Sequence, residues 1–162
     1  MNLTNAHLNL FIHLTKAAAN DYSGDSECGP GNLKNEYKKL GRRILKYIAE
    51  KMALTPDQYD IRWNPGGIAC SGDSTLHTDK VYVALHDNCG SGWFYWRTVK
   101  GRRDFTGGPN QIVRWDDFCE PEGMVNLIRV LKVAQQGSFT DPSTGDIILN
   151  INQAIRMAAG VA

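Results

Sequence analysis

Long hydrophobic runs, an excess of either charge and cysteine pairs are all missing from this chain. Its 162 residues hold 18 lysines and arginines against 17 acidic residues, so the net charge is +1. This balance excludes a global attraction to nucleic acid or to acidic membranes, and any such attraction must be local. Residues 1–21 have no basic start and are interrupted by Asn, His and Thr. They therefore indicate neither a signal peptide nor a membrane span.

Cysteine is scarce, and no C-x-x-C pair occurs among Cys28, Cys70, Cys89 and Cys119. Without a signal peptide, we expect a cytoplasmic, reducing location in which these residues remain thiols. Three catalytic or cofactor motifs are also absent: G-x-x-x-x-G-K-[ST], G-x-G-x-x-G and G-x-S-x-G. Their absence excludes a P-loop and a dinucleotide fold, and it leaves a serine hydrolase without support.

Hydrophobic periodicity divides the chain into helical ends and a strand-rich middle. Helices are predicted over 3–19, 33–52, 121–133 and 147–158, and strands over 58–64, on both sides of Thr78 within 74–87, over 92–99 and over 110–115. Successive strands with short connections favour antiparallel pairing, with one face toward the core. We therefore expect one α+β domain over residues 1–162: an antiparallel four- to five-stranded β-meander with two N-terminal and two C-terminal helices packed on it.

The loop between the last two predicted strands, VKGRRDFTGGPNQ (99–111), is long, basic and rich in glycine. Glycines bring backbone N–H groups close to whatever a loop faces, and consecutive N–H groups form anion-holding concavities. Arginine adds paired donors for phosphate. The loop therefore predicts a site for a phosphorylated or nucleotide-like ligand. A solvated hairpin in which Arg102 and Asp104 pair locally is the alternative.

The strand that enters this loop carries Trp93, Tyr95, Trp96 and Arg97. Residues alternate between the two faces of a strand, so Trp93, Tyr95 and Arg97 cannot share the core face with Trp96. An exposed aromatic set beside cations would suit base stacking and cation–π contact. The alternative is that helices cover both faces.

Two predicted turns carry histidine beside aspartate, with His77 near Asp79 and His86 near Asp87. Such pairs can transfer protons, but turn-capping aspartates with surface histidines are the favoured explanation. We predict no metal, no cofactor and a binding protein rather than an enzyme. The predicted ligand-binding residues are Arg97, Lys100, Arg102, Arg103, Thr106, Gly107, Gly108, Asn110, Trp93, Trp96, His77 and Asp79.

Residues 34–51 form a local basic segment, with seven cations and two glutamates and hence a net charge of +5. A phosphate backbone could lie along one face of this predicted helix, although a solvated helix face is the commoner arrangement. The residues of this nucleic-acid alternative are Lys34, Lys38, Lys39, Arg42, Arg43 and Lys46.

The segments GGIACSGDSTLHTDKVYV (66–83) and KGRRDFTGGPN (100–110) resemble uncharacterised small proteins of bacteriophages and mobile elements. The resemblance implies a location inside a bacterial host cell, and it assigns no residue a role. A phage-encoded protein that sequesters a nucleotide is one function in keeping with it. A protein–protein inhibitor or adaptor that binds a host protein through the Trp/Tyr/Arg surface is the alternative. We expect no membrane partner, and the sequence leaves the oligomeric state open.

Overall fold

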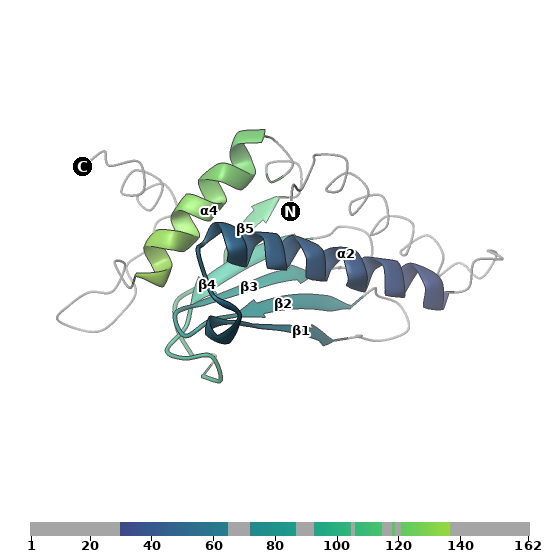
Figure 1. Ribbon diagram of the computed structural model, residues 1–162, viewed down its shortest axis with the longest axis horizontal. Helices are drawn as coiled ribbons and strands as arrows, with labels where there is room; N and C mark the ends of the chain where they lie inside the picture. Colours follow the sequence, from purple (N-terminus) through teal and green to yellow (C-terminus); the bar gives the residue numbers. More distant parts are fainter. Residues whose placement is uncertain are drawn as a thin grey trace.

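A five-stranded antiparallel sheet is the centre of the computed structural model, and its strands follow the order of the chain (Figure 1). The strands are β1 (Asp60–Asn64), β2 (Asp73–His77), β3 (Val81–His86), β4 (Trp93–Thr98) and β5 (Gln111–Arg114). The structure describes residues 30–64, 72–86, 93–104, 106–114, 118 and 121–136. The α+β class and the antiparallel five-stranded meander are confirmed.

Two helices pack against this sheet within the described residues: α2 (Pro30–Lys51) and α4 (Pro121–Gln135). A short 3₁₀ turn, η2 (Pro56–Gln58), leads from α2 into β1. The predicted helices over 3–19 and 147–158 lie outside the described residues, so the arrangement of two helices at each end is not confirmed. Helix α2 begins at Pro30, three residues before the predicted start, and proline is favoured in the first helical turn.

Helix α2 buries one apolar side, because its hydrophobic residues recur at helical spacing. Tyr37, Ile44, Leu45 and Ile48 are fully buried against β1 and β2. The helix ends where Ala53 takes a left-handed conformation with φ 64°. There Ala53 N–H donates to the Glu50 carbonyl and Leu54 N–H to the Ala49 carbonyl, both at 3.0 Å. This is the Schellman arrangement that turns the chain back toward the sheet.

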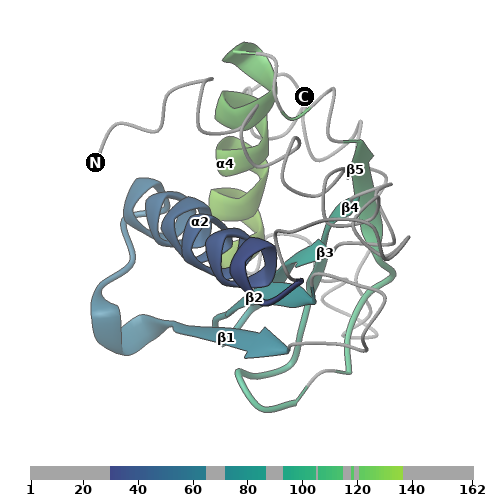
Figure 2. The same cartoon turned by 90° about the vertical axis from the view of Figure 1, so that its right-hand side faces the viewer.

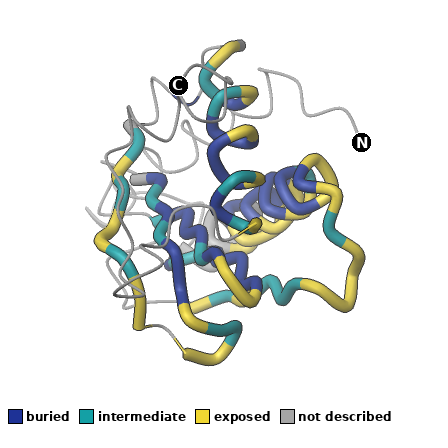
Figure 3. The backbone as a smooth tube through the Cα atoms, turned by 90° about the vertical axis from the view of Figure 1, so that its left-hand side faces the viewer, coloured by how far each residue is buried: buried dark blue, intermediate teal, exposed yellow. Residues whose placement is uncertain are grey.

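The core lies on the helix side of the sheet. In β3, Val81, Val83 and Leu85 point inward, and the register sets Leu85 opposite Phe94 and Val83 opposite Trp96. The Phe94 ring stacks on Phe118 with centroids 4.9 Å apart. Figure 2 shows α2 and α4 on the same side of the sheet, and Figure 3 shows buried residues gathered between the helices and the strands.

Helix α4 is tied to the sheet at the turn between β2 and β3. The buried Thr78 hydroxyl lies 2.6 Å from Gln135 Oε1 at the end of α4. The same hydroxyl accepts a hydrogen bond from the Val81 N–H at 2.8 Å. Thr78 thereby closes the turn and anchors the helix with one side chain. This turn also carries Asp79, which is used by the loop described below.

Candidate functional site

The second face of the sheet, opposite the helices, is polar and aromatic. No described helix or strand lies on it (Figure 2). Its residues alternate with the core residues along each strand, as the pleat requires. We call it the polar face; it consists of Asp60, Arg62, Asn64, Asp73, Thr75, His77, Tyr82, Ala84, His86, Tyr95, Arg97 and Ile112.

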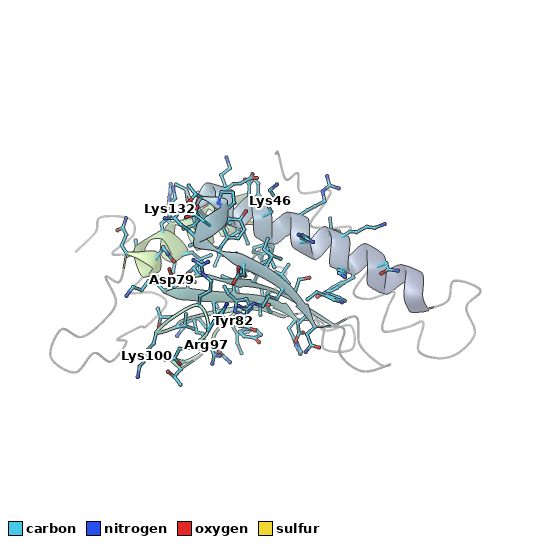
Figure 4. All side chains as sticks on the ribbon, turned by 60° about the horizontal axis from the view of Figure 1, so that its bottom comes forward. Lys46, Asp79, Tyr82, Arg97, Lys100 and Lys132 are labelled. Atoms are coloured by element: carbon cyan, nitrogen blue, oxygen red, sulfur yellow. The ribbon has the colours of Figure 1, made fainter. Side chains whose placement is uncertain are left out.

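One row of side chains crosses four strands of the polar face. The register places Asp60 opposite His77, His77 opposite Tyr82, and Tyr82 opposite Arg97. The edge of the His77 ring meets the Tyr82 ring with centroids 5.0 Å apart. The Arg97 guanidinium lies over the Tyr82 ring, 5.2 Å from the ring centroid. The row therefore joins an imidazole, a phenol and a cation in contact; Tyr82 and Arg97 are labelled in Figure 4.

Arg97 has an incomplete set of polar partners. Its Nε atom is shielded from solvent and has no hydrogen-bond partner, and no described carboxylate forms an ion pair with it. The side chain as a whole is half-buried. A guanidinium carries five donors, and a shielded donor without an acceptor is costly. The half-buried guanidinium therefore has donor capacity that no described residue uses.

A second tyrosine extends the aromatic surface beside this row. Tyr95 Oη lies 3.5 Å from Tyr82 Oη, and the two rings have centroids 5.9 Å apart. Burial, followed by the hydrogen bond with Tyr95, raises the pKa of Tyr82 well above its ordinary value. Tyr82 therefore stays a neutral phenol at physiological pH. Together the two rings form a half-buried platform next to the Arg97 charge.

A histidine–carboxylate pair borders the platform. His86 Nδ1 is hydrogen-bonded to Asp73 Oδ1 on the neighbouring strand, and the His86 ring meets Tyr95 edge-on at 6.5 Å. The contact to Asp73 orients the imidazole and leaves its Nε2 on the other side of the ring. His86 is partly exposed, with 39% of its side-chain surface accessible. The pair adds a polar group of fixed orientation to one end of the platform.

His77 is the most deeply buried titratable group of the polar face, with 5% of its surface exposed. Its Nε2 lies 2.8 Å from the Thr75 hydroxyl. Burial, followed by the positive charge of Arg62, lowers the pKa of His77 to about 4, although the Asp60 carboxylate opposes the shift. The imidazole is therefore neutral at pH 7. It supplies an aromatic edge and a hydrogen-bonding atom rather than a charge.

In the glycine-rich loop after β4, backbone N–H groups donate hydrogen bonds to acceptors of the loop itself and of β4. Lys100 N–H donates to the Thr106 carbonyl at 3.0 Å, and Gly108 N–H donates to the Thr98 carbonyl at 3.1 Å. The Asp104 carboxylate accepts from both the N–H and the hydroxyl of Thr106, at 3.0 and 2.6 Å. These bonds lower the pKa of Asp104. The loop therefore holds its own carboxylate where the sequence predicts an external anion.

Arg102 is also engaged within the protein. Its Nε lies 3.3 Å from Asp79 Oδ1, and its Nη1 donates to the Asp57 carbonyl at 2.8 Å. The predicted local pair between Arg102 and Asp104 is thus replaced by contacts with the β2–β3 turn and with η2. Arg102 thereby anchors the base of the loop.

The predicted ligand-binding residues divide into three groups. Arg97 and His77 lie together on the polar face, whereas Trp96 is fully buried on the core face. The side chain of Trp93 lies outside the described residues. The remaining residues belong to the loop or its anchor. They are Lys100 and Arg103, which are exposed, and Arg102, Thr106, Gly107, Gly108, Asn110 and Asp79.

The predicted ligand-binding set omits Tyr82, Tyr95, His86 and Asp73, although Tyr95 is named in the aromatic set and His86 at a predicted turn. The signal that could have found them is the alternation within β3, where Tyr82 and His86 fall between the buried positions. Once one set of a strand is assigned to the core, the other set belongs to the opposite face. Cross-strand register then adds Tyr95 and Asp73.

The described residues contain no group of three or more His, Cys, Asp or Glu side chains placed to hold a metal ion. Within the same part of the chain, no helix is long and apolar enough to cross a membrane. Comparison of the chain with protein-family models, curated proteins and solved structures found no match.

Proposed function

We propose that this protein binds a nucleotide-like ligand on the polar face of its sheet, with the aromatic base on the tyrosine platform and the phosphate on Arg97. The observation that carries the proposal is Arg97, a half-buried cation with an unpartnered Nε and no described carboxylate beside it. It lies against Tyr82, whose ring continues into Tyr95. Base stacking and charge-assisted hydrogen bonding are the two interactions that such a ligand requires.

The position of the loop supports phosphate binding next to Arg97. Lys100 is three residues beyond Arg97 and is exposed at the start of the loop. Figure 4 shows Arg97, Tyr82 and Lys100 on the side of the sheet away from α2. A ligand phosphate held by Arg97 would therefore gain a second positive charge from Lys100. The predicted ligand class is retained, and the proposed site lies on the polar face rather than among the loop amides.

Binding without turnover is the simplest chemistry for this face. His77 is neutral and bonded to Thr75, and Tyr82 is a neutral phenol, so neither supplies an ionised group for catalysis at pH 7. The bond from His86 to Asp73 orients one imidazole beside the platform. A protein that holds its nucleotide in this way would sequester it.

Isothermal titration with mono-, di- and cyclic nucleotides, the matching nucleosides and inorganic phosphate tests the proposal. We expect nucleotides to bind more tightly than either part alone. Arg97→Gln removes the charge while keeping most of the side chain, and should weaken nucleotide binding about tenfold or more, since a hydrogen bond to a charged group is worth about 1.5–3 kcal/mol. Chromatography of the recovered ligand should show it unchanged.

Arg103→Gln is the matched control, because Arg103 is exposed on the loop and makes no described contact. It should leave the affinity of the Arg97 site within about twofold of wild type. A loss with Arg103→Gln equal to that with Arg97→Gln would place the ligand at the loop tip instead. Absence of heat with every nucleotide at millimolar concentration would remove the proposal, and turnover of the ligand would make the protein an enzyme.

A further inference from the structure

The solvent side of α2 is almost entirely basic. Its described exposed positions are the neutral Asn35, the acidic Glu50 and six cations. The six cations, which we call the α2 stripe, are Lys38, Lys39, Arg42, Arg43, Lys46 and Lys51. The opposite side of the helix is the core contact described above. The stripe is therefore a strong local charge on a protein whose net charge is only +1.

Three of the six cations of the stripe have no described counter-ion. Arg42, Arg43 and Lys46 form no ion pair with any described residue. Lys38 and Lys51 lie near aromatic rings, with their Nζ atoms 6.0 Å from the Trp63 centroid and 5.5 Å from the Tyr47 centroid. Neither contact neutralises the charge. Most of the positive charge thus faces outward.

The spacing of the stripe works against the helix itself. Lys38, Arg42 and Lys46 follow one another at intervals of four residues, and so do Lys39 and Arg43. Like charges at this interval face each other and destabilise a helix. The first turn of α2 carries no acidic residue to offset the helix dipole. An anionic partner lying along the helix would relieve this repulsion.

The shape of the stripe selects the kind of anion. From Lys38 to Lys51 the helix rises roughly 20 Å, which matches about six phosphates along one strand of a double helix. The exposed large hydrophobic residues of the described chain, Ile112 and Val125, lie on β5 and α4. The described exposed positions of α2 therefore include no large apolar side chain to enter a membrane, and the two aromatic rings beside the stripe, Tyr47 and Trp63, are partly buried against the core.

We propose that α2 docks on the sugar–phosphate backbone of duplex nucleic acid through the α2 stripe. Lysine and arginine contacts of this kind position a protein on a duplex without reading its sequence. The stripe lies on the helix side of the sheet, whereas Tyr82 and Arg97 lie on the other side, as Figure 4 shows with Lys46. The two surfaces are separate, so this inference does not depend on the proposed nucleotide site.

The test is fluorescence anisotropy with a labelled duplex DNA of about 20 base pairs, measured from about 50 to 200 mM salt. We expect log affinity to fall with log salt at a slope of about −4, as four to five phosphate contacts require. Unlabelled single-stranded DNA, anionic lipid vesicles and poly-glutamate are the competitors, and each should displace the duplex only weakly. A flat salt dependence, or equal competition by vesicles or poly-glutamate, would overturn the proposal.

Arg42→Glu is the decisive variant, because it should weaken binding and strengthen the fold. It reverses the charge at the centre of the stripe and places a carboxylate four residues from both Lys38 and Lys46, which is a stabilising spacing. We expect about tenfold weaker DNA binding and a shallower salt slope, with a melting temperature that does not fall. Wild-type affinity in this variant would contradict the proposal.

Lys100→Glu is the control, since Lys100 lies on the loop at the other side of the molecule. It should leave duplex binding within about twofold of wild type while affecting nucleotide binding. Equal losses of DNA affinity in the two variants would show that net charge, not the α2 stripe, attracts the duplex. Arg42→Glu should in turn leave the nucleotide affinity unchanged. Each proposal can therefore be contradicted without affecting the other.

Discussion

At the scale of single residues, Arg97 and Arg102 show how two similar loop-region cations take different roles. Arg102 forms an ion pair with Asp79 and donates a hydrogen bond to the Asp57 carbonyl, and these contacts hold the loop in place. Arg97 has the Tyr82 ring beneath it and no ion pair with a described carboxylate, although the Nε of each arginine lacks a hydrogen bond. They lie five residues apart in one basic segment, Arg97 near the end of β4 and Arg102 in the loop that follows, but the sequence does not show which of them is paired. Their partners come from other strands and turns, so only the fold separates an anchor from a candidate ligand-binding group.

Gly107 packs so closely against the backbone of Thr98 that no side chain fits at this position. A Cβ atom on Gly107 would lie 2.0 Å from the Thr98 carbonyl oxygen, whereas a Cβ on Gly101 meets nothing closer than Asp104 Cβ at 3.8 Å. We expect Gly107→Ala to destabilise the fold by roughly 1–3 kcal/mol, because the backbone of β4 must move.

Urea unfolding followed by circular dichroism would measure both glycine variants. Gly101→Ala is the matched control and should change the free energy of unfolding by less than about 1 kcal/mol. Equal stability of the two variants would show that the bridge between Val99 and Gly107 is not held as tightly as this contact indicates.

At the scale of elements, the end of α2 determines where β1 begins. The Schellman turn at Ala53 closes the helix, and Leu54 packs against the core directly after it. A non-glycine residue in the left-handed region is strained, so this turn is stabilised by what surrounds it. The sequence MALTPD predicts an end here through its proline, but the strained residue is visible only in the backbone.

Ala53→Gly should therefore stabilise the protein, by about 1 kcal/mol, since glycine adopts a φ of 64° without a Cβ clash. Thermal denaturation would measure the rise in melting temperature. The same change at Ala49, in the buried helical interior, should instead destabilise by roughly 1 kcal/mol or more. A fall in stability with Ala53→Gly would show that the turn depends on the alanine methyl group.

At the scale of the whole molecule, the placement of both described helices on one side leaves the polar face to carry the titratable groups. His77 is surrounded there by Thr75, the Tyr82 ring, Arg62 and Asp60. Its folded-state pKa of about 4 lies below the ordinary value of 6.5. The unfolded chain therefore takes up the proton first. The stabilising contribution of neutral His77 is complete above pH 6.5 and is lost as the pH falls toward 4.

We expect global stability to fall between about pH 6.5 and 4 by up to about 3 kcal/mol from His77 alone, since each pKa unit corresponds to about 1.4 kcal/mol. Urea unfolding of wild type and His77→Gln across this range would isolate the effect, because glutamine cannot titrate. The difference in stability between the two proteins should shrink steadily on acidification. Parallel pH curves would mean that folded His77 protonates as readily as a free histidine.

The sequence by itself determined the elements: the strand segments on both sides of Thr78, the basic helix and the short antiparallel connections all follow from local periodicity. It also divided β4 into two sets, with Tyr95 and Arg97 on one face and Phe94 and Trp96 on the other. Only the tertiary structure decided which set is buried, because the answer depends on which side the helices cover. The site proposed on the polar face likewise depends on the cross-strand register, which brings Tyr82 and Arg97 together. Periodicity is a local property, whereas the partner of a charge is set by register and by residues far away along the chain, as the contact of Arg102 with Asp57 shows.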